Sequence, residues 1–396
     1  MAVISKVEVI DFKYELKDMG AAVENAHNHV GYLKGGVLPM SKYAVVIECE
    51  DGSRGEYVTH WGGTKPALAQ TLMVVSDLPG KDSDMREALF NEANRRLCHM
   101  DHMGYGPVDI ALWDLAGKQA GKSIAAMIGQ FRKTIPAYAS TFHGDHTGML
   151  DSYEAFCDFA VQCRDMGYKA FKHHGWFDGD AKAEATLIRK LREAVGDEMV
   201  LMYDGASDLN NFADALYVGK ACDDAGLFWY EDPYRDNSMS AFAHNKLRGM
   251  IKTPLLITEH VRALEAKCDF LRAGGTDFLR ADPEYDMGIT GVIKTARMAE
   301  AFGVDVEVHA CGPAHRQVLG AIRNTNYYEL AEVGPKLKNI IPPCYADGYK
   351  DELDSIDENG MIAIPDGPGL GVAYDWDWLD AHTVQKYVFE NKKGSK

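Results

Sequence analysis

Clustered positive charge is absent from this sequence. Its 396 residues carry 42 Lys and Arg against 59 Asp and Glu, a formal net charge of -17 at neutral pH. Because binding to nucleic-acid phosphates depends on clustered Lys and Arg, this balance argues against nucleic acid as a partner. The sequence also lacks an apolar run of 18 residues, so it predicts no membrane span and no membrane partner.

Cysteine spacing of the kind that holds zinc or builds a disulfide framework is lacking too. The eight Cys are scattered without a C-x-x-C pair. The opening residues, MAVISKVEVIDF, alternate like a strand and lack the apolar core of a signal peptide. We therefore expect a reduced, soluble, cytoplasmic protein.

What the sequence does contain divides by pattern near residue 130. In residues 1–130, strand-like alternation in SKVEVIDFKYEL and KYAVVIECEDGSRGEYVTH flanks a loop rich in Gly, Asn and His. From Lys65 to Gly129 the pattern turns helical. This order predicts an α+β domain.

Residues 131–365 repeat one unit, an apolar strand followed by an amphipathic helix. YKAFKHH, MVLMYDG and LFWYEDP are examples of the strands, and DAKAEATLIRKLREAVG is an example of the helices. Such alternation implies parallel strands with helical crossovers, and about eight units predict a closed barrel. A doubly wound open sheet is the alternative, but the G-x-G-x-x-G phosphate loop of many such folds is missing.

Polar, ionisable side chains end the predicted strands. They are Lys172 and His174, Asp204, Glu231, Glu259, Asp282, His309 and Glu329. Intervals of 27, 28 and 27 residues separate Asp204 from Glu231, Glu231 from Glu259, and Asp282 from His309. Since each interval approximates one strand–helix unit, these residues are expected to ring the carboxyl-end rim of the barrel, where catalytic groups lie.

Three of these residues, Asp204, Glu231 and Glu259, are carboxylates on successive strands. Like charges brought together repel one another and need a counter-charge. The three carboxylates therefore predict a bound cation, and all-oxygen ligation favours Mg²⁺ over Mn²⁺ or Ca²⁺.

The ordered series DG, YEDP, TEH, DP, H and E resembles the enolase superfamily, specifically its mandelate racemase-type branch. The passage GPVDIALWDLAGKQAGKSIAAMIG resembles the end of that family's capping domain. The resemblance implies an α/β fold with a modified TIM barrel, (β/α)₇β. It places an α+β N-terminal capping domain at 1–130, the barrel at 131–365 and a C-terminal segment returning to the cap at 366–396. It also implies a symmetric homo-oligomer.

The resemblance also implies roles for individual residues. Asp204, Glu231 and Glu259 match the ligands of one Mg²⁺ per chain. Asp282 and His309 match an Asp–His dyad, in which the carboxylate fixes the imidazole tautomer. Glu329 matches the acid that hydrogen-bonds the substrate carboxylate, and we expect a raised pKa there, with Glu329 acting as a donor.

The second barrel strand departs from the family's common Lys-x-Lys pattern, because GYKAFKHHGW gives Lys172-x-His174. Lys172 is either the base opposite His309 or an electrostatic neighbour of the substrate carboxylate. His174 replaces the second Lys as acid, base or hydrogen-bond donor. His173 alternates to the other side and is expected to be structural.

Weaker candidates come from the cap and from acids near the rim. Asn28, Tyr32, His60 and Trp61 are predicted substrate-binding residues, because cap loops close over such barrels. Merely solvated positions are an equally good interpretation of each. Asp232 is expected to support the metal ligands from behind or to form a turn, and Glu307 and Glu332 are expected to be structural.

The predicted activity is dehydration of a sugar acid, an aldonate or aldarate. An α-proton is removed next to the carboxylate, and the ene-diolate then loses a β-hydroxyl to give a 2-keto-3-deoxy acid. A racemase, epimerase or cycloisomerase of an α-hydroxy acid is the same-site alternative. A non-catalytic sugar-acid binding protein is the alternative from a different class.

Overall fold

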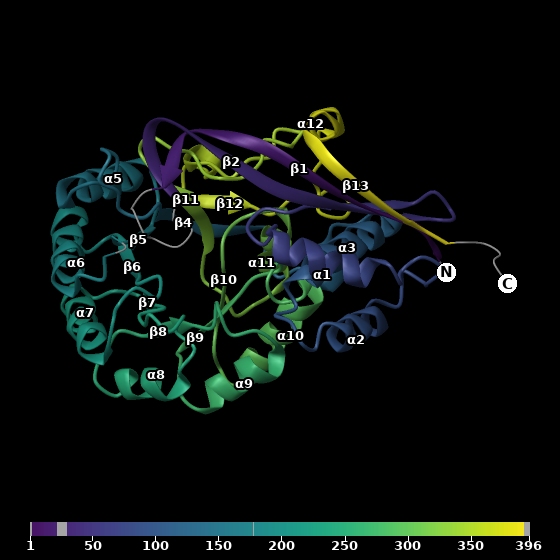
Figure 1. Cartoon of the computed structure of the whole chain (residues 1–396). Coiled ribbons are helices and arrows are strands. Elements are labelled where there is room, and N and C mark those ends of the chain that lie inside the picture. Colours follow the sequence, from purple (N-terminus) through teal and green to yellow (C-terminus); the bar gives the residue numbers. More distant parts are fainter. Residues whose placement is uncertain (1, 22–29, 177, 392–396) are drawn as a thin grey trace.

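The computed structural model describes residues 2–21, 30–176 and 178–391. Within these ranges the strands form an antiparallel sheet and a larger, curled parallel sheet (Figure 1). The parallel sheet carries its helices on the outside, and the antiparallel sheet lies across one end of it (Figure 1). None of the described helices is long and apolar enough to cross a membrane.

The antiparallel sheet joins the two ends of the chain. Its order is β13 (Thr383–Glu390), β1 (Ile4–Ala21), β2 (Val30–Cys49) and β3 (Arg54–Val58). Its helices and short turns are α1 (Lys65–Val75), α2 (Arg86–Arg96), η1 (Met103–Tyr105), α3 (Gly106–Ala120) and α4 (Ile124–Ile128). Strand β1 is covered on both faces, because Val7 and Val9 pack into the main core while Phe12 and Tyr14 pack towards α12 (Trp376–His382).

Eight parallel strands and seven crossover helices make the barrel. The strands are β4 (Thr134–Thr141), β5 (Ala170–His174), β6 (Val200–Asp204), β7 (Tyr230–Glu231), β8 (Leu255–Ile257), β9 (Phe278–Ala281), β10 (Val306–Val308) and β11 (Tyr328–Val333). The helices are α5 (Tyr153–Met166), α6 (Ala181–Val195), α7 (Phe212–Ala225), α8 (Ala241–Arg248), α9 (Leu264–Arg272), α10 (Gly288–Ala301) and α11 (Pro313–Ala321). Strand β11 pairs with β4, and β10 lies beside β11, so the sheet curls into a ring.

This arrangement confirms the predicted (β/α)₇β barrel with a separate α+β sheet. Outside the ring, β12 (Met361–Ala363) pairs antiparallel with β4, and η2 (Leu353–Ser355) precedes it. The division of the chain near residues 130 and 365 stays a prediction.

Local sequence explains why the crossover helices begin where they do. The side chains of Ser152, Asp180, Asn211 and Ser240 accept hydrogen bonds from the first turns of α5, α6, α7 and α8. Such caps satisfy backbone N–H groups that have no partner within the helix. Each helix therefore starts just after the loop that leaves the carboxyl-end rim.

Alternation along the strands directs the polar side chains into the barrel. Ala170 of β5, Met202 of β6 and Trp229, which directly precedes β7, belong to one small buried cluster. Two residues further along each strand come Lys172, Asp204 and Glu231. Because strand side chains alternate with a period of two, these polar residues share the inner face of that cluster and lie nearer the rim.

Candidate active site

A cavity of about 250 Å³ opens at the carboxyl ends of the barrel strands. Seven of the predicted site residues line it: Trp61, Lys172, His174, Asp204, Glu259, His309 and Glu329. The lining also includes residues that the sequence did not single out for the site: His143, Asp232, His260, Tyr285 and Glu332. These side chains therefore meet at the carboxyl-end rim, as the strand intervals predict.

Lys172 lies at the centre of a group of buried carboxylates. Its Nζ is 3.2 Å from Oδ2 of Asp204, 2.8 Å from Oε2 of Glu231 and 2.8 Å from Oε1 of Glu329. Burial alone would lower the pKa of Lys172, but Glu231 and Glu329 outweigh burial and hold the pKa well above its usual value. Lys172 is thus a charged neighbour of the carboxylates in this state of the protein.

Arg280 is a second buried cation, and sequence reasoning missed it. It is fully buried on β9, with Nε 2.8 Å from Oε1 of Glu231 and Nη2 2.5 Å from Oε2 of Glu329. The signal was available, because Arg280 stands two residues before Asp282 and so faces the same side of the strand. Glu231 is itself fully buried between the two cations, and it is not part of the cavity lining.

A buried counter-charge, Arg280, lowers the pKa of Glu329, and the expected raised pKa beside a bound metal and substrate carboxylate stays a prediction. Burial raises the pKa of Glu329, but Arg280 and then Lys172 outweigh burial and hold it well below its usual value. The expectation counted the negative charges around Glu329 but not this buried guanidinium. Glu329 is therefore a carboxylate that accepts hydrogen bonds, including one from the backbone N–H of Ala310 at 2.7 Å.

Glu329→Gln is expected to lower kcat on the order of 10²-fold or more, the usual loss when a preorganised electrostatic group is removed. The amide keeps the shape of the side chain but removes the charge that pairs with Lys172 and Arg280. Steady-state kinetics of Glu329→Gln beside Glu329→Ala measures the effect. Near wild-type activity in the glutamine variant would show that the charge of Glu329 is dispensable.

Arg280→Met is expected to cost about 3–5 kcal/mol of unfolding free energy, because it leaves buried carboxylates without their counter-charge. Chemical denaturation followed by circular dichroism measures this loss. Arg323→Met is the matched control, since Arg323 pairs with Glu300 on the surface with 57% of its side chain exposed. Equal stability of the two variants would contradict the buried-charge account.

The predicted Asp–His dyad is formed. Nδ1 of His309 lies 2.7 Å from Oδ2 of Asp282, and Nε2 lies 3.5 Å from Oε1 of Glu259 in the cavity. Burial would lower the pKa of His309, but Glu259 and Asp282 outweigh it and raise the pKa to about 9. Tyr285 stacks on the imidazole at 5.3 Å, and Trp61 meets it edge-on at 6.2 Å. These contacts fix the ring and leave Nε2 as the reactive atom.

His174 is held at both ring nitrogens. Nδ1 lies 2.7 Å from the carbonyl oxygen of Thr141 and Nε2 lies 3.1 Å from Oδ2 of Asp204. Since a carbonyl and a carboxylate both accept, an imidazolium that donates twice satisfies both contacts. Burial opposes the charge, but Asp204 outweighs it and raises the pKa of His174. His173, as expected, lies away from the cavity and stacks on Tyr203 at 4.8 Å.

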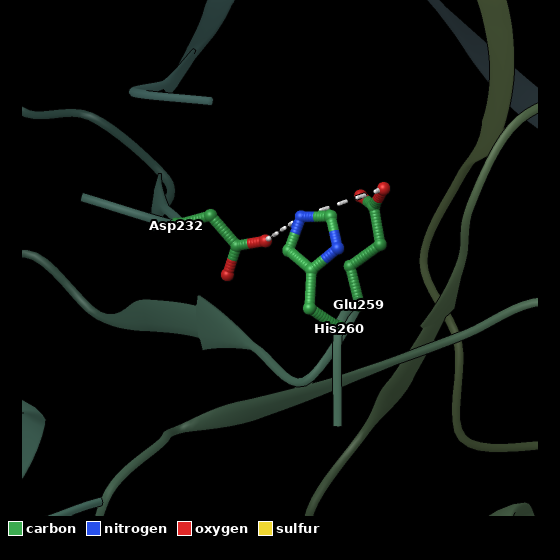
Figure 2. A group of neighbouring side chains, drawn as sticks. All are labelled: Asp232, Glu259 and His260. Atoms are coloured by element: carbon green, nitrogen blue, oxygen red, sulfur yellow. Dashed lines mark ion pairs between the residues drawn. The ribbon is translucent and has the colours of Figure 1, made fainter. Parts of the chain in front are cut away.

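Asp232, Glu259 and His260 form a further group of potential ligands (Figure 2). Nε2 of His260 is 3.6 Å from Oδ2 of Asp232 and 4.0 Å from Oε1 of Glu259. Oδ1 of Asp232 is buried without a hydrogen-bond partner among the described residues. Burial raises the pKa of Asp232 well above its usual value, and the charge of Glu259 adds to that effect.

The carboxylate oxygens that line the cavity fit a hard divalent cation. The cavity is lined by the carboxylates of Asp204, Asp232 and Glu259, and one buried oxygen has no partner of its own. Carboxylate oxygens are the ligands that Mg²⁺ prefers. The predicted ligand set of Asp204, Glu231 and Glu259 stays a prediction, and Asp232 lies within reach of the same space.

A buried acid anchors the cap beside the dyad. Glu284, just after β9, accepts hydrogen bonds from the hydroxyl of Tyr57 at 2.6 Å and from the backbone N–H of His60 at 2.7 Å. The backbone N–H of Gly62 also donates to it. A Cβ at Gly62 would lie 2.8 Å from Cβ of Glu284, so glycine permits this close approach. Glu284 therefore holds the cap segment that places Trp61 against the imidazole of His309.

The four predicted cap residues have different outcomes. Trp61 lines the cavity, and its Nε1 donates to the carbonyl oxygen of Cys311 at 3.2 Å. His60 is buried behind it with Nε2 2.6 Å from the hydroxyl of Tyr345, and burial lowers the pKa of His60 to about 3. Tyr32 is buried away from the cavity lining, beneath Lys336 at 4.9 Å. Asn28 lies outside the described residues.

Comparison with curated proteins gives relatives that match this chain over most of their length. The chain is 27% identical over 352 residues to a D-galactarolactone cycloisomerase from Agrobacterium fabrum, covering 85% of this chain and 89% of the relative. It is 24% identical over 371 residues to an arabinonate dehydratase from Saccharolobus solfataricus, covering 90% and 91%. The relatives thus include both dehydratases and cycloisomerases.

Comparison with solved structures agrees. A D-glucarate dehydratase from Agrobacterium tumefaciens, crystallised with magnesium, superposes with a TM-score of 0.83 at 27% identity, over 97% of this chain and all of that one. The model of the mandelate racemase / muconate lactonizing enzyme N-terminal domain matches residues 37–129, and that of the enolase C-terminal domain-like family matches residues 155–378. The chain therefore belongs to the enolase superfamily, in its mandelate racemase / muconate lactonizing enzyme branch.

Proposed function

We propose that this chain is a Mg²⁺-dependent dehydratase that converts a sugar acid to a 2-keto-3-deoxy acid. One observation carries the proposal: Lys172 and His309 line the same cavity, together with the carboxylates of Asp204 and Glu259. Their strands are separated by β4 and β11 on one side of the ring and by β6 to β9 on the other. A substrate carbon held at the carboxylates would therefore have an ionisable nitrogen on each side, able to exchange a proton with it.

The relatives support this activity. They include dehydratases of arabinonate and D-glucarate, whose reactions remove water from a sugar acid. A polar cavity rich in histidine and carboxylate side chains suits a polyhydroxylated substrate. The proposed partner of this chain is accordingly a small-molecule sugar acid.

The residues divide the reaction between them. Asp204, Glu231 and Glu259 would hold Mg²⁺, which when bound stabilises negative charge developing on the substrate carboxylate. One of Lys172 and His309 takes the proton from the α-carbon as the C–H bond breaks. The other gives a proton to the β-hydroxyl as the C–O bond breaks, so that water leaves and the enol product becomes the keto acid.

A cycloisomerase or epimerase is the second candidate, favoured by the 27% identity to a D-galactarolactone cycloisomerase. It would use the same α-proton transfer without net loss of water. The two candidates therefore differ in their product and share the first step.

A library of mono- and dicarboxylic sugar acids separates these candidates. Incubation with Mg²⁺, followed by semicarbazide detection of keto acids, is expected to show keto-acid formation that chelation abolishes. Proton NMR in deuterated water reports exchange at the α-carbon for every compound. An inverted or isomerised product without keto acid would establish the second candidate. Binding without exchange or turnover would establish the non-catalytic alternative.

A further inference from the structure

The last barrel strand sends an extra carboxylate into the cavity. Pairing of β11 with β4 runs through Leu330 and resumes at Val333 after an irregularity, and Glu332 within it has a φ of 50°. Strict alternation would face Glu329 and Ala331 inward and turn Glu332 away. Instead Ala331 and Glu332 both line the cavity. Irregularities of this kind re-aim a side chain and are frequent beside active sites.

Two features of Glu332 indicate a ligand-binding role rather than the structural one expected from sequence. Its Oε2 is buried and has no hydrogen-bond partner among the described residues. Buried polar atoms nearly always have partners, so an acceptor left open at a cavity is available to a bound molecule. A positive φ at a residue other than glycine is strained, and such strain clusters at functional sites.

The charged groups around Glu332 place it on the cap side of the cavity. His174, Lys42, His309 and Glu329 are the charged groups that act on it. Lys42 belongs to β2 of the antiparallel sheet, and its Nζ lies 3.5 Å from the carbonyl oxygen of Trp61. Burial raises the pKa of Glu332 to about 7, with His174 and Lys42 acting in the other direction.

The cavity has little to offer a second substrate carboxylate. Sites that recognise a carboxylate commonly use Arg, whose planar fork makes two parallel hydrogen bonds. No Arg occurs among the described residues that line this cavity, and the Lys in that lining, Lys172, already contacts three carboxylates. Glu332 adds another acid where a chain extending from the reacting carbons towards the cap would lie.

We propose that Glu332 determines specificity by hydrogen-bonding a hydroxyl of the distal sugar chain and repelling a second carboxylate there. The substrate class is then a monocarboxylic sugar acid rather than a dicarboxylic one. This assignment rests on the proposed function, which supplies the position of the reacting carbons. Where Glu332 is ionised, a hydroxyl can donate to its carboxylate, whereas an ionised substrate carboxylate cannot.

Matched probes test this inference by binding. D-gluconate and D-glucarate differ only in whether the distal carbon is a hydroxymethyl or a carboxylate, and D-galactonate and galactarate form a second such pair. Above a pH of about 7, where Glu332 is ionised, titration calorimetry of the Mg²⁺-loaded protein is expected to show a preference of about tenfold or more for the monoacid of at least one pair. Glu332→Gln is expected to reduce that preference by about tenfold, because the amide removes the repulsion.

Glu307→Gln is the matched control. Glu307 is a buried acid on β10 outside the cavity lining, with Oε1 accepting from Nδ2 of Asn326 at 2.7 Å. This variant is expected to keep the wild-type preference. Circular dichroism confirms folding, and Glu332→Ser is the second variant if Glu332→Gln does not fold.

Three outcomes overturn the inference: the wild type binds the diacids at least as tightly as the monoacids, a folded Glu332 variant keeps the full preference, or none of the four probes binds. Failure of the proposed function is distinguishable, because it appears as absent keto-acid formation in the substrate library. The binding preference is measured without turnover.

Discussion

Glu259→Gln is expected to abolish Mg²⁺ binding and turnover together while the protein stays folded. Glu259 is the residue shared by the predicted ligand set with Asp204 and Glu231 and by the group with Asp232 and His260. Its Oε1 faces the cavity between the imidazoles of His309 and His260. Removing this carboxylate should therefore cost more than the 10- to 100-fold loss typical of residues that only orient a metal ligand.

Calorimetric titration with Mg²⁺, beside steady-state kinetics, measures both losses. Asp269→Asn is the control, because Asp269 is a surface acid with 78% of its side chain exposed. Asp232→Asn distinguishes the two possible sets of ligands. If Asp204, Glu231 and Glu259 hold the metal, this variant keeps most of the Mg²⁺ affinity. Wild-type activity that survives exhaustive chelation would contradict any metal assignment.

The position of the rim could be predicted because parallel strands impose it. Asp204 and Glu231 are the last residues of β6 and β7, and His174 is the last residue of β5. Side chains at the carboxyl ends of consecutive parallel strands meet at one face, whatever the helices between them look like. Strand intervals of nearly constant length therefore predict that these residues gather at one rim.

The charge balance inside the barrel could not be predicted in the same way. Arg280 stands in the segment FLRADP, and strand alternation predicts the side of the strand on which its side chain lies. Its pairing with Glu231 and Glu329 depends in addition on the relative positions of three strands. That guanidinium is the largest of the charges that lower the pKa of Glu329. Long-range ion pairs of this type leave no local pattern in the sequence.

Glu332 and Asp232 show a different reason for failure. Both have positive φ values, 50° and 32°, and neither is glycine. A prediction from sequence assumes regular strand geometry up to the turn. Residues with positive φ depart from that geometry, and the surrounding structure holds them in this conformation. Both line the cavity, although Glu332 was expected to be structural and Asp232 to support the metal ligands or form a turn. The homo-oligomer and the cytoplasmic location stay predictions.

His309→Asn is expected to stop dehydration while α-proton exchange with solvent continues. Nδ1 of His309 is occupied by Asp282, so Nε2 is the atom that faces the substrate. If Lys172 removes the α-proton from the other side, this nitrogen delivers a proton to the departing hydroxyl. Loss of a general acid typically costs 10²–10⁴-fold, enough to make elimination undetectable beside exchange.

Proton NMR in deuterated water follows exchange and elimination in one sample, once the substrate library has supplied a substrate. Lys172→Met is the complementary variant and is expected to lose both processes, because no α-proton is removed. The opposite pattern, with His309→Asn losing exchange as well as dehydration, would make His309 the base and Lys172 the electrostatic neighbour that its three carboxylate contacts also allow. The two variants together therefore show whether Lys172 or His309 removes the α-proton.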